Sequence, residues 1–189
     1  MKKNFKLAFV VLAAICFGQQ AKAQLTATTT GSAKVNIVLA DALSITMGAT
    51  PDVTFTYNQT SDYAGAKSES KPAHFTVISN RNYDVTVSAT ALSPAPAKSS
   101  VNSPNINVDD ILAAVKVKVL NPVAIEHGTP FTVALATSYT GNTGKLATNA
   151  AASTTTVFDI EYSIPDATPL FNVAAGTYST TVKYTATQL

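Results

Sequence analysis

Beyond residue 24, apolar and polar residues alternate along most of the chain. From Tyr83 to Ala89 every second residue is apolar, and the residues between are Asp, Thr and Ser. Successive side chains of a β-strand point to opposite faces, so this pattern predicts a strand with one buried side. The segments that share the pattern are 53–57, 75–77, 83–89, 115–119, 131–135, 158–164 and 178–185.

The breaks between these segments contain Gly, Pro and Asn, the residues that favour turns. Residues 109–114 form the one helix-like stretch, of a single turn at most, and the longest expected loops are 58–72, 92–106 and 136–153. Short strands with no helices between them favour antiparallel pairing. The sequence therefore predicts an all-β antiparallel sandwich, immunoglobulin-like or pilin-like, of about seven to nine strands, because each segment has one apolar and one polar face.

The first 23 residues have the features of a secretory signal peptide. Three lysines precede the uncharged apolar run 7–17, and Ala21-Lys22-Ala23 places small residues where a signal peptidase requires them. Cleavage is expected between Ala23 and Gln24, which leaves residues 24–189 as one domain without a stable membrane anchor. Cys16 would be the lipid-carrying residue of a lipoprotein signal, but bulky Ile15 precedes it, and an ordinary apolar role in the run is the simpler interpretation.

Removal of the signal peptide changes the charge of the protein. It takes four of the 13 basic residues and leaves nine against 11 acidic ones. The exported chain then lacks the basic surface that nucleic acids require. It also has no cysteine, so burial rather than disulfides must stabilise it in the periplasm, at the cell surface or outside the cell.

Candidate chemistry is sparse. The two histidines, His74 and His127, have no metal-ligand spacing, and no Gly-x-Ser-x-Gly motif is present. Asn105, Asn107 and Asp109-Asp110 offer oxygen ligands for calcium but lack the remainder of a known calcium loop, so a helix start is the alternative. We therefore expect no enzyme activity, cofactor or metal site.

One aromatic residue has a setting that favours exposure. Tyr63 lies in the segment Asp62-Tyr63-Ala64-Gly65, whereas most other tyrosines share parity with core residues. Loops on a rigid sandwich often carry recognition sites. This supports an alternative hypothesis, a monomeric module that binds a carbohydrate or cell-wall polymer through its loops.

Apolar and polar residues alternate at both ends of the exported chain. Near the N-terminus, one parity of residues 25–39 predicts a subunit-contact strand, with Leu25, Ala27, Gly31, Ala33, Val35 and Ile37 on one side. Near the C-terminus, the same reasoning predicts an acceptor strand that includes Gly176, Tyr178, Val182 and Tyr184. An extended segment that completes the sheet of a neighbouring molecule gains main-chain hydrogen bonds, and its alternate side chains fill the partner's groove.

These ends resemble the secreted bacterial pilin-type β-sandwiches related to spore coat protein U. The resemblance rests on the segments TTTGSAKVNIVLADALSI and GTYSTTVKYTAT. The chain also resembles uncharacterised exported bacterial proteins with a Phe-x-Tyr…Asp-Tyr…Gly segment and a Tyr-Ser-Ile-Pro segment. Here these are Phe55-Thr56-Tyr57, Asp62-Tyr63, Gly65 and Tyr162-Ser163-Ile164-Pro165. In such pilins an assembly chaperone recognises a glycine 14 residues from the end and the alternating apolar residues after it. Here that glycine is Gly176. Gln188 replaces their penultimate aromatic residue and the paired cysteines are missing, which argues against usher-driven assembly.

The sequence therefore predicts an exported, non-enzymatic structural or adhesive surface subunit that assembles by strand addition. The expected partners are copies of itself or other surface subunits, with a glycan or the cell wall as the ligand in the alternative hypothesis.

Overall fold

The computed structural model describes residues 30–100, 105–123, 126–141 and 143–189. By its internal contacts the chain divides into two units, residues 1–38 and residues 39–189. In the first unit, the described residues 30–38 form no helix or strand, and their side chains are exposed. The second unit contains the strands and helices of the described chain. The predicted signal peptide and the cleavage site at Ala23 and Gln24 lie outside the described residues.

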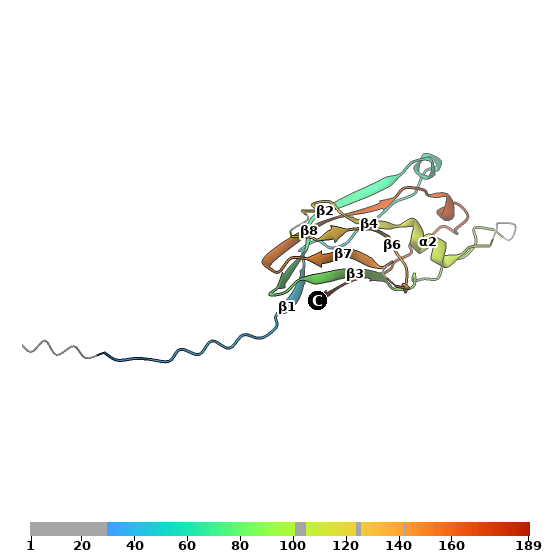
Figure 1. Ribbon diagram of the computed structural model, residues 1–189. Helices are drawn as coiled ribbons and strands as arrows, with labels where there is room; N and C mark the ends of the chain where they lie inside the picture. Colours follow the sequence, from blue (N-terminus) through green and yellow to red (C-terminus); the bar gives the residue numbers. More distant parts are fainter. Residues whose placement is uncertain (1–29, 101–104, 124–125, 142) are drawn as a thin grey trace, which may run out of the picture. The chain divides into compact units, whose positions relative to one another are not determined.

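Two antiparallel sheets form the second unit (Figure 1). The five-stranded sheet has the order β1–β2–β8–β4–β6, with bounds Leu43–Met47, Lys67–Ser79, Ser153–Ile164, Lys116–Val119 and Thr132–Ala134. The four-stranded sheet has the order β5–β7–β3–β9, with bounds Thr129–Pro130, Lys145–Ala150, Tyr83–Ala89 and Val182–Gln188. The predicted all-β sandwich is confirmed, with nine strands in the described chain.

The core lies between the two sheets and is built from alternate residues of their strands. Its fully buried side chains include Val77, Val85, Val117 and Ile160, which come from four different strands and both sheets. At the centre, the rings of Phe75 and Phe158 stack with centroids 4.6 Å apart. Burial of large apolar side chains on one face of each strand therefore explains the two-layer fold.

Three short helices lie in the connections of the described chain. They are η1 (Thr60–Ala64), α2 (Val108–Ala114) and η2 (Thr168–Leu170). A helix at the expected position is confirmed, but its seven residues make about two turns where at most one was expected. Asn107 begins it, because its side chain accepts a hydrogen bond from the Asp109 amide at 3.1 Å. Nowhere in the described chain is a helix both long and apolar enough to cross a bilayer.

Two predicted strands differ from the structure in instructive ways. Residues 53–57 form no strand, although Val53 and Phe55 still pack against the core, as their parity predicts. In residues 131–135, Val133 is buried but Phe131 is 43% exposed. Phe131 is exposed because it lies between β5 and β6, where the chain crosses from one sheet to the other.

Two of the predicted loops contain strands. The first half of β2 falls in the expected loop 58–72; its residues are mostly polar, and pairing with β8 holds them in the sheet. The strand β7 falls in the expected loop 136–153. Its pairing with β3 is irregular, and Leu146 and Ala147 are both buried, so the alternation that marks a strand is broken.

Candidate functional site

The strand β9 forms one edge of the four-stranded sheet. It pairs with β3 along its whole length, from Val182 opposite Ala89 to Gln188 opposite Tyr83, and it has no strand neighbour on its other side in the described chain. The other sheet edges are β1, β5 and β6, with five, two and three residues, whereas β9 has seven. Natural proteins keep exposed edges short. A long edge is therefore the feature that most needs explanation.

The direction of the β9 backbone groups follows from its register. Thr90 donates to the Thr181 carbonyl, and Leu189 donates to the Asn82 carbonyl, both at 2.9 Å. In an antiparallel pair, residues that bond across the ladder alternate with residues that do not. The amide and carbonyl groups of every second residue, Val182, Tyr184 and Ala186, therefore point away from β3 toward the open side.

A chain of buried hydrogen bonds fixes β9 against the opposite sheet. The hydroxyl groups of Tyr162 on β8 and Tyr184 on β9 lie 2.6 Å apart. Nε2 of His74 on β2 lies 2.9 Å from the Tyr162 hydroxyl. Because these bonds cross the interior, they hold the edge strand in place against the opposite sheet.

The surroundings of these hydrogen-bonded side chains keep the imidazole and the hydroxyl groups uncharged. Burial lowers the pKa of His74, and the positive charge of Lys71 lowers it further. Burial also raises the pKa of Tyr184 far above its usual value, and the adjacent Tyr162 adds to the effect. Nδ1 of His74 is buried without a hydrogen-bond partner in the described chain. We therefore assign these three residues a structural role in positioning β9.

One end of β9 is joined to the start of β1. The side-chain amide of Gln188 donates to the Ala42 carbonyl at 2.7 Å and to Oδ1 of Asn80 at 3.0 Å. The Asn80 side chain also accepts from the Ala42 amide and donates to the Ala40 carbonyl, both at 2.9 Å. The free part of the β9 edge is therefore Val182–Ala186.

The predicted acceptor residues are only partly in this strand. Val182 and Tyr184 belong to β9, with Tyr184 buried and Val182 half-buried. Gly176 and Tyr178 precede it, and the Tyr178 hydroxyl donates to the Ala174 carbonyl at 2.7 Å. The strand therefore begins later than the alternation predicts, at Val182. Residues 174–181 before it are outside the strand and form only an isolated bridge, between Ser179 and Ser93.

The predicted subunit-contact segment is exposed where the structure describes it. Gly31, Ala33, Val35 and Ile37 lie in no strand, and Val35 is 81% exposed. Ile37, Val38 and Leu39 are exposed to a similar degree. Leu25 and Ala27 fall outside the described residues. A run of large apolar side chains open to solvent is typical of a surface that binds a partner.

Tyr63 lies at a different place, on η1. It is half-buried rather than fully exposed, because its ring packs 5.0 Å from the ring of Tyr57 and 5.7 Å from the ring of Phe171. Phe171 follows η2 and is 64% exposed. Phe171 was not predicted from the sequence, although an aromatic residue in the connection Pro169-Leu170-Phe171-Asn172, outside every predicted strand, was a usable signal.

The histidines take structural positions. His127 is buried, with Nε2 2.7 Å from the Val157 carbonyl and the ring 4.7 Å from Phe158. Within the described ranges, no group of three or more His, Cys, Asp or Glu side chains is arranged to hold a metal ion.

No protein-family model matches the chain, and no curated protein sequence is similar to it. Functional inference for this protein therefore comes from its own residues and geometry.

Proposed function

We propose that this protein is a non-enzymatic structural or adhesive surface subunit that assembles by strand addition, with an N-terminal segment of one copy adding to β9 of another. The observation that carries the proposal is the open edge at Val182–Ala186, which belongs to β9, the longest edge strand in the described chain. The same chain supplies an alternating segment, residues 24–39, with no proline and a single charge, Lys34. Its described part, residues 30–39, is exposed.

The energetics of strand addition identify the residues that should decide it. Backbone bonds contribute about 0.5–1.5 kcal/mol each, and ordering a residue costs about 1–2 kcal/mol. These two contributions are of similar size, so backbone pairing alone gives little net affinity. Burial of a Val or Ile side chain adds about 1.5–3 kcal/mol. Leu25, Val35 and Ile37, the large apolar residues predicted for the contact side, should therefore contribute most of the binding free energy.

The N-terminal segment provides the direct test. In a chain that starts at Gln24, deletion of residues 24–33 should convert oligomers into monomers, measured by gel filtration and electron microscopy. The double variant Val35→Ser/Ile37→Ser should do the same, because it removes apolar side chains from the contact parity. Circular dichroism should stay unchanged in both, since the described part of the segment belongs to no strand.

A matched control separates strand addition from general loss of contacts. The double variant Lys34→Ser/Asn36→Ser changes neighbouring residues of the opposite parity and should assemble like the unaltered chain. If the unaltered chain is monomeric at high concentration and neither the deletion nor the serines change its size, the proposal is wrong.

A further inference from the structure

A second surface lies at the connections that contain η1, α2 and η2. Phe171 is 64% exposed there, and its ring and that of Tyr63 meet edge to face at an interplanar angle of 88°. Tyr63 in turn packs on Tyr57, and the Lys67 ammonium group lies 4.8 Å from the Tyr57 ring centroid. The three rings therefore support one another, and Phe171 is held in position although it is open to solvent.

Two hollows adjoin this row of rings. The first, of about 300 Å³, is lined by Tyr63, Phe171 and Thr60, and it shares Thr168 and Asn172 with the second. The second hollow has a volume of about 270 Å³. Small-molecule sites begin at about 300 Å³, so each hollow has room for a small group such as one ring of a larger ligand.

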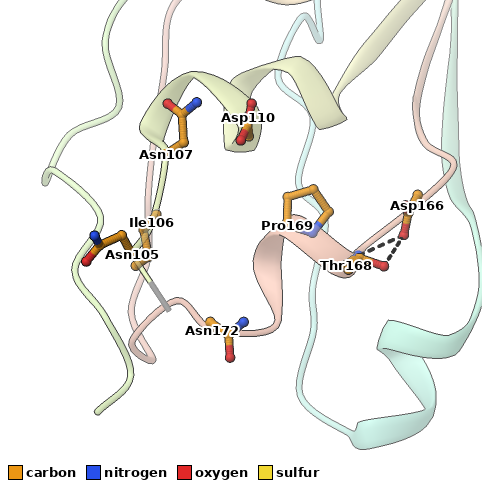
Figure 2. A pocket seen from close by; sticks show the side chains of 8 residues that line it. All are labelled: Asn105, Ile106, Asn107, Asp110, Asp166, Thr168, Pro169 and Asn172. Atoms are coloured by element: carbon orange, nitrogen blue, oxygen red, sulfur yellow. Dashed lines mark hydrogen bonds between the residues drawn. The ribbon is translucent and has the colours of Figure 1, made fainter. Parts of the chain in front are cut away.

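The second hollow is lined mainly by amides and carboxylates (Figure 2). Figure 2 shows Asn107 and Asp110 on the α2 side, Asn105 on the segment before the helix, and Asn172 opposite the helix. The side chains of Asn105, Asp110 and Asn172 have no hydrogen-bond partner within the part of the chain that the structure describes. They are therefore available to donate to and accept from a ligand.

The charge of the lining restricts the ligand. Asp110 and Asp166 contribute carboxylates, and none of the described residues that line either hollow is Lys or Arg. An anionic ligand would be repelled here, whereas hydroxyl groups can donate to carboxylates and pair with amides. A sugar ring combines such hydroxyls with an apolar C–H face that can pack on an aromatic ring.

We propose that Phe171, Tyr63 and the amide-lined hollow beside Asn172 form a binding site for a neutral polysaccharide. One sugar ring packs on Phe171, and the next sugar ring of the polysaccharide places its hydroxyls among Asn105, Asp110 and Asn172. This site is formed by residues 57–172 and does not depend on strand addition.

The test uses an array of immobilised neutral oligosaccharides of glucose, galactose, mannose and N-acetylglucosamine, with sulfated oligosaccharides as the anionic comparison. The chain from Gln24 should bind at least one neutral class and none of the sulfated ones. Phe171→Ala should weaken that binding about tenfold, as expected for loss of an aromatic contact. Asn172→Ala should weaken it as well.

Phe131→Ala is the matched control, because Phe131 is also an exposed phenylalanine but lines neither hollow. It should bind like the unaltered chain. The variant that lacks residues 24–33 should also keep its binding, which separates this site from assembly. Absence of binding to every neutral oligosaccharide, or equal binding by Phe171→Ala and the unaltered chain, would overturn the proposal.

Discussion

Replacing Ala186 by proline is expected to abolish assembly while the sandwich stays folded. The Ala186 amide points away from β3, as the register of the β3–β9 pair requires. Proline has no amide hydrogen, and its ring would occupy the space beside the free edge. Proline is tolerated on edge strands where the missing amide faced solvent, so pairing with β3 should survive. Gel filtration measures the oligomers, and circular dichroism measures the fold.

Ala186→Ser is the control for this substitution. It keeps the backbone amide and nearly the same volume, so it should assemble like the unaltered chain. Oligomers of normal size from Ala186→Pro would show that the β9 edge is not the contact between copies.

Replacing Phe158 by alanine is expected to lower the free energy of unfolding by about 3–5 kcal/mol. The Phe158 ring is fully buried, stacks on Phe75 at 4.6 Å and meets the His127 ring edge-on at 4.7 Å. Truncation would leave a cavity between the two sheets that neighbouring side chains fill only partly. Urea denaturation followed by circular dichroism gives the difference directly.

The neighbouring residue on β8 supplies the control. Val157 points to the opposite face of the sheet and is exposed, so Val157→Ala should change the free energy of unfolding by less than about 0.5 kcal/mol. A loss below about 1 kcal/mol for Phe158→Ala would mean that the ring is not part of a packed core.

The fold was predictable because alternation reports burial directly. Val85, Val117 and Ile160, which the sequence placed on apolar faces, are all fully buried. Single residues within these segments were less predictable. Phe131 has the parity of a core residue, but its exposure depends on where the chain changes sheets, which is a property of the topology rather than of local sequence.

Among the strands that were not predicted, β1 carries the alternation, with Leu43, Ile45 and Met47 at every second position, whereas β7 and the first half of β2 lack it. In β7 the irregular pairing with β3 and the left-handed backbone of Asn149, with a φ of 55°, disrupt the period of two. In the first half of β2, Lys67 and Lys71 stand at positions where an apolar residue would mark a buried side. Lys67 forms an ion pair with Asp62 at 2.9 Å, and Lys71 pairs with Glu69 at 2.7 Å.

The candidate sites were predictable to different degrees. The alternating C-terminal strand was visible in the sequence, but its place at a sheet edge depends on strand order, which pairing across the whole fold determines. The second surface brings Tyr63, Asn105 and Phe171 together from three distant segments. Tyr63 was identified from its local setting alone, whereas the contact with Phe171 could be found only in three dimensions.

The most direct test of strand addition is crosslinking between two different single-cysteine variants. The chain from Gln24 has no cysteine, so each engineered thiol is unique. One variant carries Asn36→Cys in the N-terminal segment, and the other carries Thr185→Cys on the exposed face of β9. Thr46→Cys on β1, another sheet edge, is the control for the second position.

The variants are mixed, treated with a short bismaleimide and analysed by denaturing gel electrophoresis and mass spectrometry. Side chains on the same face of adjacent strands lie within the reach of such a reagent. We expect a crosslinked dimer of Asn36→Cys with Thr185→Cys, and little with Thr46→Cys. Absence of that dimer in a mixture that still contains oligomers, or equal crosslinking to Thr46→Cys, would contradict the assignment of β9 as the strand that receives a neighbouring copy.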